Sequence, residues 1–165
     1  MIIRIAKILL LATVALFYTL VALNNVTDFD SNYQFVRHVL MMDTTFPGNK
    51  AMWRSLNSPL WHLSFYFSII IWEIMTMVLA WFGVLMLLRK VRRPVEEFNL
   101  AKRVPIVALT TGMLMWMVAF LTIGAEWFLM WQSRIWNGQE AAFRMFVVLG
   151  IVLSLVMHPD REGQA

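Results

Sequence analysis

The chain has 165 residues, of which 60% are hydrophobic and 15% are charged, and its formal net charge is +4. A soluble domain is closer to half apolar, so this composition favours lipid as the solvent for much of the surface. Cysteine is absent, which excludes disulfides, thiolate metal sites and cysteine nucleophiles. The positive charge gathers beside apolar segments, a pattern typical of membrane topology, so we expect no nucleic-acid partner.

Four apolar segments are long enough to cross a bilayer as helices, for which about 20 residues are needed. The sequence predicts helices over residues 5–23, 60–88, 105–131 and 140–157, with an outer loop at 24–59 and a cytoplasmic loop at 89–104. The first segment starts like a signal peptide, but its apolar run is too long for one, so we expect it to be retained. The predicted fold class is all-α: residues 1–165 form one integral membrane four-helix bundle.

The orientation follows from the charges of the short loops. The loop between the second and third helices carries six basic residues within fifteen positions: Arg89, Lys90, Arg92, Arg93, Lys102 and Arg103. The short loop between the third and fourth helices has only Arg134. Because basic loops stay in the cytoplasm, we expect the loop at 89–104 there. Two helices lie on each side of this loop, so both termini should be in the cytoplasm as well.

The outer loop contains a short helical pattern. Asp30 and Ser31 are good N-caps, and the following run over residues 32–42 places Phe35, Val39 and Met42 on one face. Pro47 and Gly48 would end the segment. We therefore predict a short periplasmic amphipathic helix that lies on the membrane or caps the bundle.

Two charged residues lie at matching depths in the last two helices. Glu126 is six residues before Gln132, about 9 Å below the outer end of its helix, and Arg144 is five residues after Gln139, about 7.5 Å below. Since an unpaired charge in a membrane is costly, the sequence predicts an ion pair between Glu126 and Arg144. The alternative is that one of them binds a ligand from outside.

Glu73 lies near the middle of the second helix, where no basic residue lies at its depth. Helical spacing places it on one stripe with His62, Tyr66, Thr76 and Ala80, which we expect to face the bundle interior. One interpretation is a protonated carboxyl that donates to a neighbour such as Trp116, Thr13 or Ser154. The other is an intramembrane polar site at Glu73, His62, Tyr66 and Thr76 that accepts a proton or a cation from outside.

Metal, haem and catalytic chemistry find little support. His38, Met41 and Asp43 are the candidate metal ligands, and His38 with His62 would be needed for bis-histidine haem. Solvated or packed side chains are the alternative for all of them. No nucleophile elbow, paired catalytic carboxylates, zinc-binding helix or phosphate loop is present, so we predict neither a cofactor nor an enzymatic activity.

Several segments resemble a known family. They are Asn24-Asn25 to Asp28, His38-Val39 to Asp43-Thr44-Thr45-Phe46-Pro47, Glu126-Trp127-Phe128 to Met130-Trp131-Gln132-Ser133, and Trp136-Asn137-Gly138-Gln139. Together they resemble the bacterial family of predicted small integral membrane proteins known as domain of unknown function 2165. The resemblance spans nearly the whole chain and implies four helices in a bacterial inner membrane, and it carries no established activity.

The motif residues gather on the predicted periplasmic side. This outer polar cluster comprises Asn24, Asn25, Asp28, Asn32, His38, Asp43, Thr44, Thr45, Trp127, Trp131, Gln132, Ser133, Trp136, Asn137 and Gln139. These residues could tie the two outer loops together by hydrogen bonds, or they could form a pocket or a docking surface with tryptophan anchors.

Two functional hypotheses follow. The first is a non-enzymatic accessory or interaction subunit of a larger membrane assembly, whose partners are the lipid bilayer and another membrane protein or complex. The second is a periplasm-facing site for a proton, a metal ion or a small molecule, centred on Glu73 and the outer polar cluster.

Overall fold

The structure, a computed structural model, describes residues 1–161 and contains four helical spans long and apolar enough to cross a membrane. Two of them are α1 (Ile2–Thr27) and α3 (Pro59–Lys90). The third is the stretch Val95–Trp127, and the fourth is α6 (Gln139–Met157). No strand occurs within residues 1–161, so the predicted all-α membrane bundle is confirmed.

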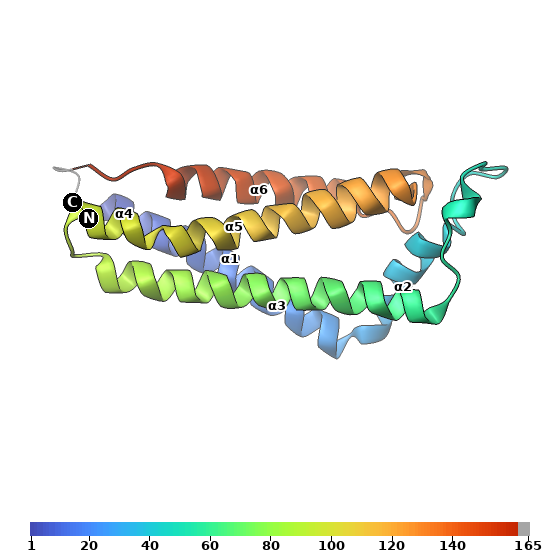
Figure 1. The fold of residues 1–165 in the computed structure, drawn as a ribbon, viewed down its shortest axis with the longest axis horizontal. Coiled ribbons are helices and arrows are strands. Elements are labelled where there is room, and N and C mark those ends of the chain that lie inside the picture. The colour runs from blue at the N-terminus through green and yellow to red at the C-terminus, as the bar shows by residue number, and fades with distance from the viewer. Residues whose placement is uncertain (162–165) are drawn as a thin grey trace.

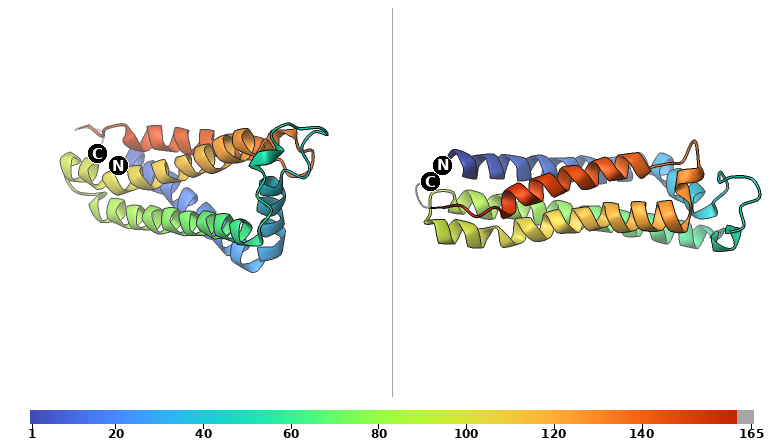
Figure 2. Two further views of the ribbon diagram at one scale, coloured as in Figure 1. Left: turned by 45° about the vertical axis from the view of Figure 1, so that its right-hand side comes forward. Right: turned by 90° about the horizontal axis from the view of Figure 1, so that it is seen from above.

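The start of α1 and the end of α6 lie at one end of the bundle, which we call the terminal end (Figure 1). The opposite end, the loop end, carries α2 (Phe29–Met41) and two short 3-10 helices, η1 (Met52–Arg54) and η3 (Met130–Gln132). In Figure 2, α2 runs across the loop end at a steep angle to the long helices. It therefore covers the bundle at that end.

The helix in the first long loop starts earlier than the sequence predicted. It begins at Phe29, so Asp30 and Ser31 lie inside it and no side chain caps it. It ends at Met41, before the left-handed residue Met42 with φ 55°, and not at Pro47 and Gly48. Asp28 alone separates α1 from α2, because its φ of −113° and ψ of 54° interrupt the helix.

The predicted apolar face of α2 is confirmed. Val39 and Met42 are buried in an apolar cluster at the loop end, and Phe35 packs against that cluster. This small apolar core joins α2 to the end of the third span through Ala125, Phe128 and Met130. Burying apolar surface here holds the helix across the bundle.

The third span is longer than predicted at its start. It consists of α4 (Val95–Ala101), α5 (Arg103–Leu114) and η2 (Met115–Trp127), so most of the predicted loop 89–104 is helical. Pro105 lies in the first turn of α5. It packs on α3 at Gly83, where an added Cβ would come within 3.1 Å of the proline ring. The glycine therefore lets α3 and α5 approach closely.

The Tyr18 side chain of α1 packs closely against Gly112 of α5. A Cβ at Gly112 would lie only 2.7 Å from the Tyr18 hydroxyl oxygen, so a larger residue would displace Tyr18. The same hydroxyl accepts a hydrogen bond from Trp116 Nε1 at 3.0 Å. Tyr18 is fully buried, and this bond satisfies its oxygen within the bundle.

The segment η2 is a π-helix of 13 residues. Its hydrogen bonds reach five residues back, as in the bond from Phe128 N to Ile123 O at 3.0 Å. π-Helices are rare and usually span a single turn. The wider turn changes which side chains face inward: Gly124 and Ala125 are buried, whereas Thr122 and Glu126 are exposed.

A buried ionic cluster closes the terminal end. Asp160 accepts hydrogen bonds from Lys7 at 2.8 Å and from Lys102, and all three side chains are almost completely buried. Both lysines also donate to the carbonyl oxygen of His158, at 2.6 and 2.9 Å. Asn99 exchanges two hydrogen bonds with the Asp160 backbone, both 3.1 Å long. The cluster thus joins α1, the third span and the tail after α6.

A second cation, Arg4, closes the terminal end between α1 and the turn after α3. Its Nη1 donates to the carbonyl oxygens of Val91 and Arg93, at 2.9 and 2.7 Å. Its guanidinium lies 4.7 Å from the centre of the Phe98 ring, within the range of a cation–π contact. The Arg4 side chain is only 2% exposed, which its place in the sequence beside an apolar run does not indicate.

We expect Asp160→Asn to lower the free energy of unfolding by about 3–5 kcal/mol, because it leaves two buried lysines without a counter-charge. The measurement is denaturant unfolding of the full chain in detergent. Glu140→Gln is the control, because Glu140 forms an exposed ion pair with Arg144 one helical turn away and its loss should change little.

The pH dependence tests the same cluster. Burial alone would raise the pKa of Asp160, but hydrogen bonds from Lys102 and Lys7 lower it below its ordinary value of 3.8. The stability contributed by a carboxylate with a lowered pKa is present above pH 4 and is lost as the pH falls further. Asp160→Asn should lack this acid-dependent loss. Equal stability of Asp160→Asn and Glu140→Gln would contradict the account.

Candidate functional site

The predicted polar stripe on α3 is buried along its length. His62, Tyr66, Glu73, Thr76 and Ala80 are each 3% exposed or less. Their spacing keeps them on one side of the helix, and α1 and α5 cover much of that side. The stripe therefore faces the interior of the bundle, as the sequence predicted.

Glu73 is hydrogen-bonded to Asn25 of α1. Asn25 Nδ2 donates to Glu73 Oε2 at 2.6 Å. Tyr66 Oη donates to the Asn25 backbone oxygen at 2.8 Å and lies 3.3 Å from its side-chain oxygen. One asparagine thus contacts two residues of α3 that are two turns apart. We call these three residues the Asn25 network.

This arrangement corrects two expectations. Asn25 was placed in the outer polar cluster, but it is buried beneath the loop end and contacts Glu73. The partners expected for Glu73 bond elsewhere: Trp116 donates to Tyr18, and Thr13 and Ser154 each donate to a carbonyl of their own helix. The short polar side chains satisfy themselves locally, which leaves Glu73 to an amide from α1.

The other two members of the stripe make separate contacts. His62 Nε2 lies 2.7 Å from the carbonyl oxygen of Leu56 and so anchors the loop before α3. Thr76 donates to the carbonyl of Trp72 at 2.9 Å, one turn back. Both side chains are paired with backbone groups. The four predicted residues therefore do not form one site: Tyr66 and Glu73 contact Asn25, whereas His62 and Thr76 make separate local contacts.

Hydrogen bonds tie the two loops of the loop end together. Gln132 Oε1 accepts from the backbone N of Phe46 at 3.1 Å and from Asn49 Nδ2 at 3.4 Å. Thr44 donates to Ser133 Oγ at 2.8 Å, and the same oxygen accepts from two backbone N–H groups of its own loop. This part of the outer polar cluster therefore acts as a structural joint.

His38 and Asp43 form a pair, with Nδ1 and Oδ2 2.7 Å apart. The His38 ring stacks on Trp136 at a centroid distance of 4.7 Å and an interplanar angle of 5°. Met41 is the third candidate ligand, but residues 1–161 contain no group of three histidine, aspartate or glutamate side chains able to hold a metal ion. The pair joins the end of α2 to the loop before α6.

The remaining members of the cluster make local contacts. Asn32 donates to the backbone oxygen of Asp28 at 3.3 Å, and Thr45 donates to that of Met42 at 2.8 Å. Asn137 Oδ1 accepts from the backbone N of Gln139 at 3.0 Å. The Asn24 side chain is exposed, and so are Trp127 and Trp131.

The predicted ion pair between Glu126 and Arg144 does not form. Arg144 instead pairs with Glu140, one turn away on α6. Glu126 is exposed near the end of η2 and not at a depth of two turns, because the third span ends at Trp127.

The comparisons fit a membrane bundle of this kind. The family described as predicted small integral membrane protein (DUF2165) matches residues 3–159. The chain belongs to this family. No curated protein and no solved structure matches it. The match covers all four helical spans, so this member of the family is an integral membrane protein in contact with the lipid bilayer.

The Asn25 network generates a stability prediction. Asn25→Leu should lower the free energy of unfolding by about 1–3 kcal/mol, because it leaves the buried Glu73 carboxyl without its donor. Glu73→Gln keeps an oxygen acceptor for Asn25, so its effect should be smaller. Denaturant unfolding in detergent measures both. The role assigned to Asn25 would be wrong if Asn25→Leu were as stable as the native chain.

Proposed function

We propose that the protein is a non-enzymatic accessory subunit of a larger assembly in a bacterial inner membrane. The observation that carries this proposal is a group of exposed apolar side chains held on rigid loops at the loop end. We call Phe46, Pro47, Trp131 and Ile135 the docking surface; their exposed fractions include 53% for Phe46 and 74% for Ile135.

The docking surface is preorganised. The Phe46 and Trp131 rings pack edge to face at 5.8 Å and 89°. Gln132, the residue after Trp131, accepts a hydrogen bond from Phe46 N, and this bond holds the backbones of the two rings together. A surface that is already ordered loses little conformational entropy on binding, and exposed tryptophan is a frequent anchor at protein interfaces. These properties suit a partner that is itself a membrane protein.

The charge pattern supports an orientation for this subunit. Arg89, Arg92, Arg93 and Arg103 are exposed at the terminal end. Basic residues beside spans favour the cytoplasmic side. The terminal end with both termini would then face the cytoplasm, and the docking surface would face the periplasm.

Single cysteines test this orientation, because the native chain has none. Asn49→Cys places a thiol at the loop end, and Arg92→Cys places one at the terminal end. In intact cells, we expect a membrane-impermeant maleimide to label only Asn49→Cys. After lysis it should label both. Labelling of Arg92→Cys alone in intact cells would reverse the orientation.

A pull-down tests the subunit proposal. The tagged full chain is isolated from its native membrane in mild detergent, and co-purifying proteins are quantified by mass spectrometry. We expect a stoichiometric membrane-protein partner. Ile135→Asp should reduce its recovery about tenfold or more, because it places a charge in an apolar contact.

Glu73→Gln is the matched control for this experiment. Because Glu73 lies inside the bundle, this variant should recover the partner as well as the native chain does. A chain that is isolated alone, or a partner recovered equally with Ile135→Asp, would contradict the proposal.

The second candidate function is a proton or cation site at Glu73. It is favoured by one observation: within residues 1–161, Glu73 forms no ion pair with a basic residue. Two observations argue against it. The Glu73 carboxyl already accepts a hydrogen bond from Asn25, and the residue is only 3% exposed. Loss of function in a stably folded Glu73→Gln variant that retains its partner would favour this second function.

A further inference from the structure

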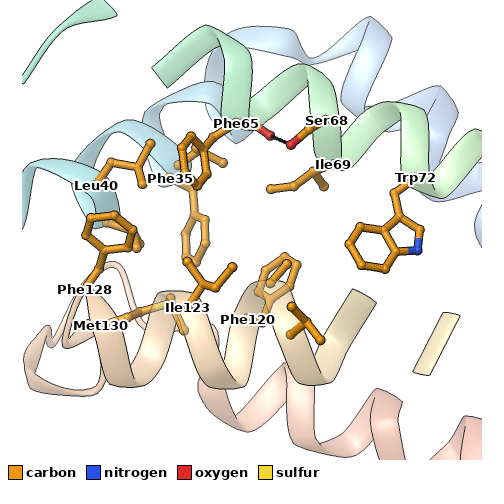
Figure 3. Close-up of a pocket in the computed structure, with 15 residues that line it drawn as sticks. Phe35, Leu40, Phe65, Ser68, Ile69, Trp72, Phe120, Ile123, Phe128 and Met130 are labelled. Atoms are coloured by element: carbon orange, nitrogen blue, oxygen red, sulfur yellow. Dashed lines mark hydrogen bonds between the residues drawn. The ribbon is translucent and has the colours of Figure 1, made fainter. Parts of the chain in front are cut away.

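An apolar cavity of about 130 Å³ lies between α2, α3 and η2 (Figure 3). Its walls include Phe65, Ile69 and Trp72 of α3 and Phe120 and Ile123 of η2. The polar groups in the wall are satisfied elsewhere: Ser68 donates to the carbonyl of Phe65, and Trp72 Nε1 donates to that of Thr111. The cavity therefore suits a purely apolar occupant.

The cavity lies at the depth of the hydrocarbon layer. The 32 residues of α3 extend about 48 Å, whereas the hydrocarbon core is about 30 Å thick. Phe65 and Trp72 lie about 9 and 20 Å along the helix from Pro59. Two lining residues, Ser68 and Val118, are exposed on the outside of the bundle, so the cavity opens sideways towards lipid.

The positively charged side chain of Arg54 lies beside this cavity at the loop end. A second depression is lined by Trp53, Arg54 and Trp127, and it shares Phe65 and Phe128 with the cavity. The Arg54 guanidinium lies 5.3 Å from the centre of the Trp53 ring and 4.8 Å from that of Trp127. The two indoles thus hold the charge next to the cavity.

Arg54 has unused capacity to bind an anion. Within residues 1–161 it forms no ion pair, and the one hydrogen bond of its guanidinium runs from Nη1 to the Trp127 carbonyl at 3.3 Å. Its Nε is buried without a hydrogen-bond partner. A planar guanidinium with free donors matches the oxygens of a phosphodiester.

We propose that Arg54 and the cavity together bind one anionic phospholipid from the leaflet at the loop end. The phosphodiester pairs with Arg54 between Trp53 and Trp127, and one acyl chain enters the cavity past Phe65. A helix about 10 Å across is too wide for a cavity of this volume, whereas an acyl chain is narrow and apolar. The docking surface uses other residues, so this lipid site is independent of the proposed function.

The test measures lipid occupancy of the full chain in neutral detergent by native mass spectrometry. The probes are dioleoyl phosphatidylglycerol, dioleoyl phosphatidylcholine with the same acyl chains, and glycerol 3-phosphate without any. We expect phosphatidylglycerol to bind about tenfold more tightly than phosphatidylcholine, because a hydrogen bond between charged groups is added. Glycerol 3-phosphate should not bind measurably.

Two variants separate the two halves of the site. Arg54→Gln should abolish the preference for phosphatidylglycerol, whereas Arg134→Gln, an exposed arginine of the same end, should keep it. Ala119→Leu fills the cavity and should weaken phosphatidylglycerol binding about tenfold, whereas Ala141→Leu on the exposed side of α6 should not. Circular dichroism and elution volume check that each variant is folded.

The outcomes that overturn the proposal are equally definite. They are equal binding of the two lipids by the native chain, an unchanged preference in Arg54→Gln, unchanged affinity in Ala119→Leu, or binding of glycerol 3-phosphate as tight as that of the lipid. If Ala119→Leu does not fold, dihexanoyl phosphatidylglycerol replaces it. This short-chain lipid should bind the native chain at least tenfold more weakly than the dioleoyl form, and equal binding would refute the acyl-chain site.

Discussion

The hydrogen bond from Asn25 to Glu73 fixes the last turn of α1 against the middle of α3. Inside a bilayer no water can replace a lost partner, so polar groups at this depth must be paired within the protein. Tyr66 adds a bond to the Asn25 backbone, so the end of α1 is held at two levels of α3. Asp28 then interrupts the helix, and α2 starts from a fixed point and crosses the loop end. This contact therefore helps to set where α2 and the loops of the loop end begin.

The polar groups divide into those that hold the bundle and those that remain available. The Asn25 network and the cluster around Asp160 are buried and satisfied, which is the expected condition of polar groups that stabilise a fold. The available groups lie at the loop end: the apolar side chains of the docking surface, and Arg54 between two tryptophans. Our proposals place function on these surfaces and not at the buried carboxylates.

Sequence patterns predicted the four spans and the buried side of α3, because both follow from local periodicity. They did not predict the partner of Glu73, because Asn25 is 48 residues away and adjoins Asn24, whose side chain is exposed. Glu126 was misplaced because its depth was counted from a helix end near Gln132, whereas the third span ends at Trp127 and is π-helical there. The burial of Asp160 depends on how α1, α4 and the tail meet, which no single segment encodes.

A double-mutant cycle between Asn25 and Glu73 tests the central claim most directly. The free energy of unfolding in detergent is measured for the native chain, Asn25→Leu, Glu73→Leu and the double variant. Hydrogen bonds between membrane helices average about 0.6 kcal/mol and reach about 1.7 kcal/mol in such cycles. We predict a coupling energy in the upper part of this range, because Glu73 has no other side-chain partner within residues 1–161. A coupling energy indistinguishable from zero would contradict the account, because the last turn of α1 would then gain nothing from its hydrogen bond to Glu73.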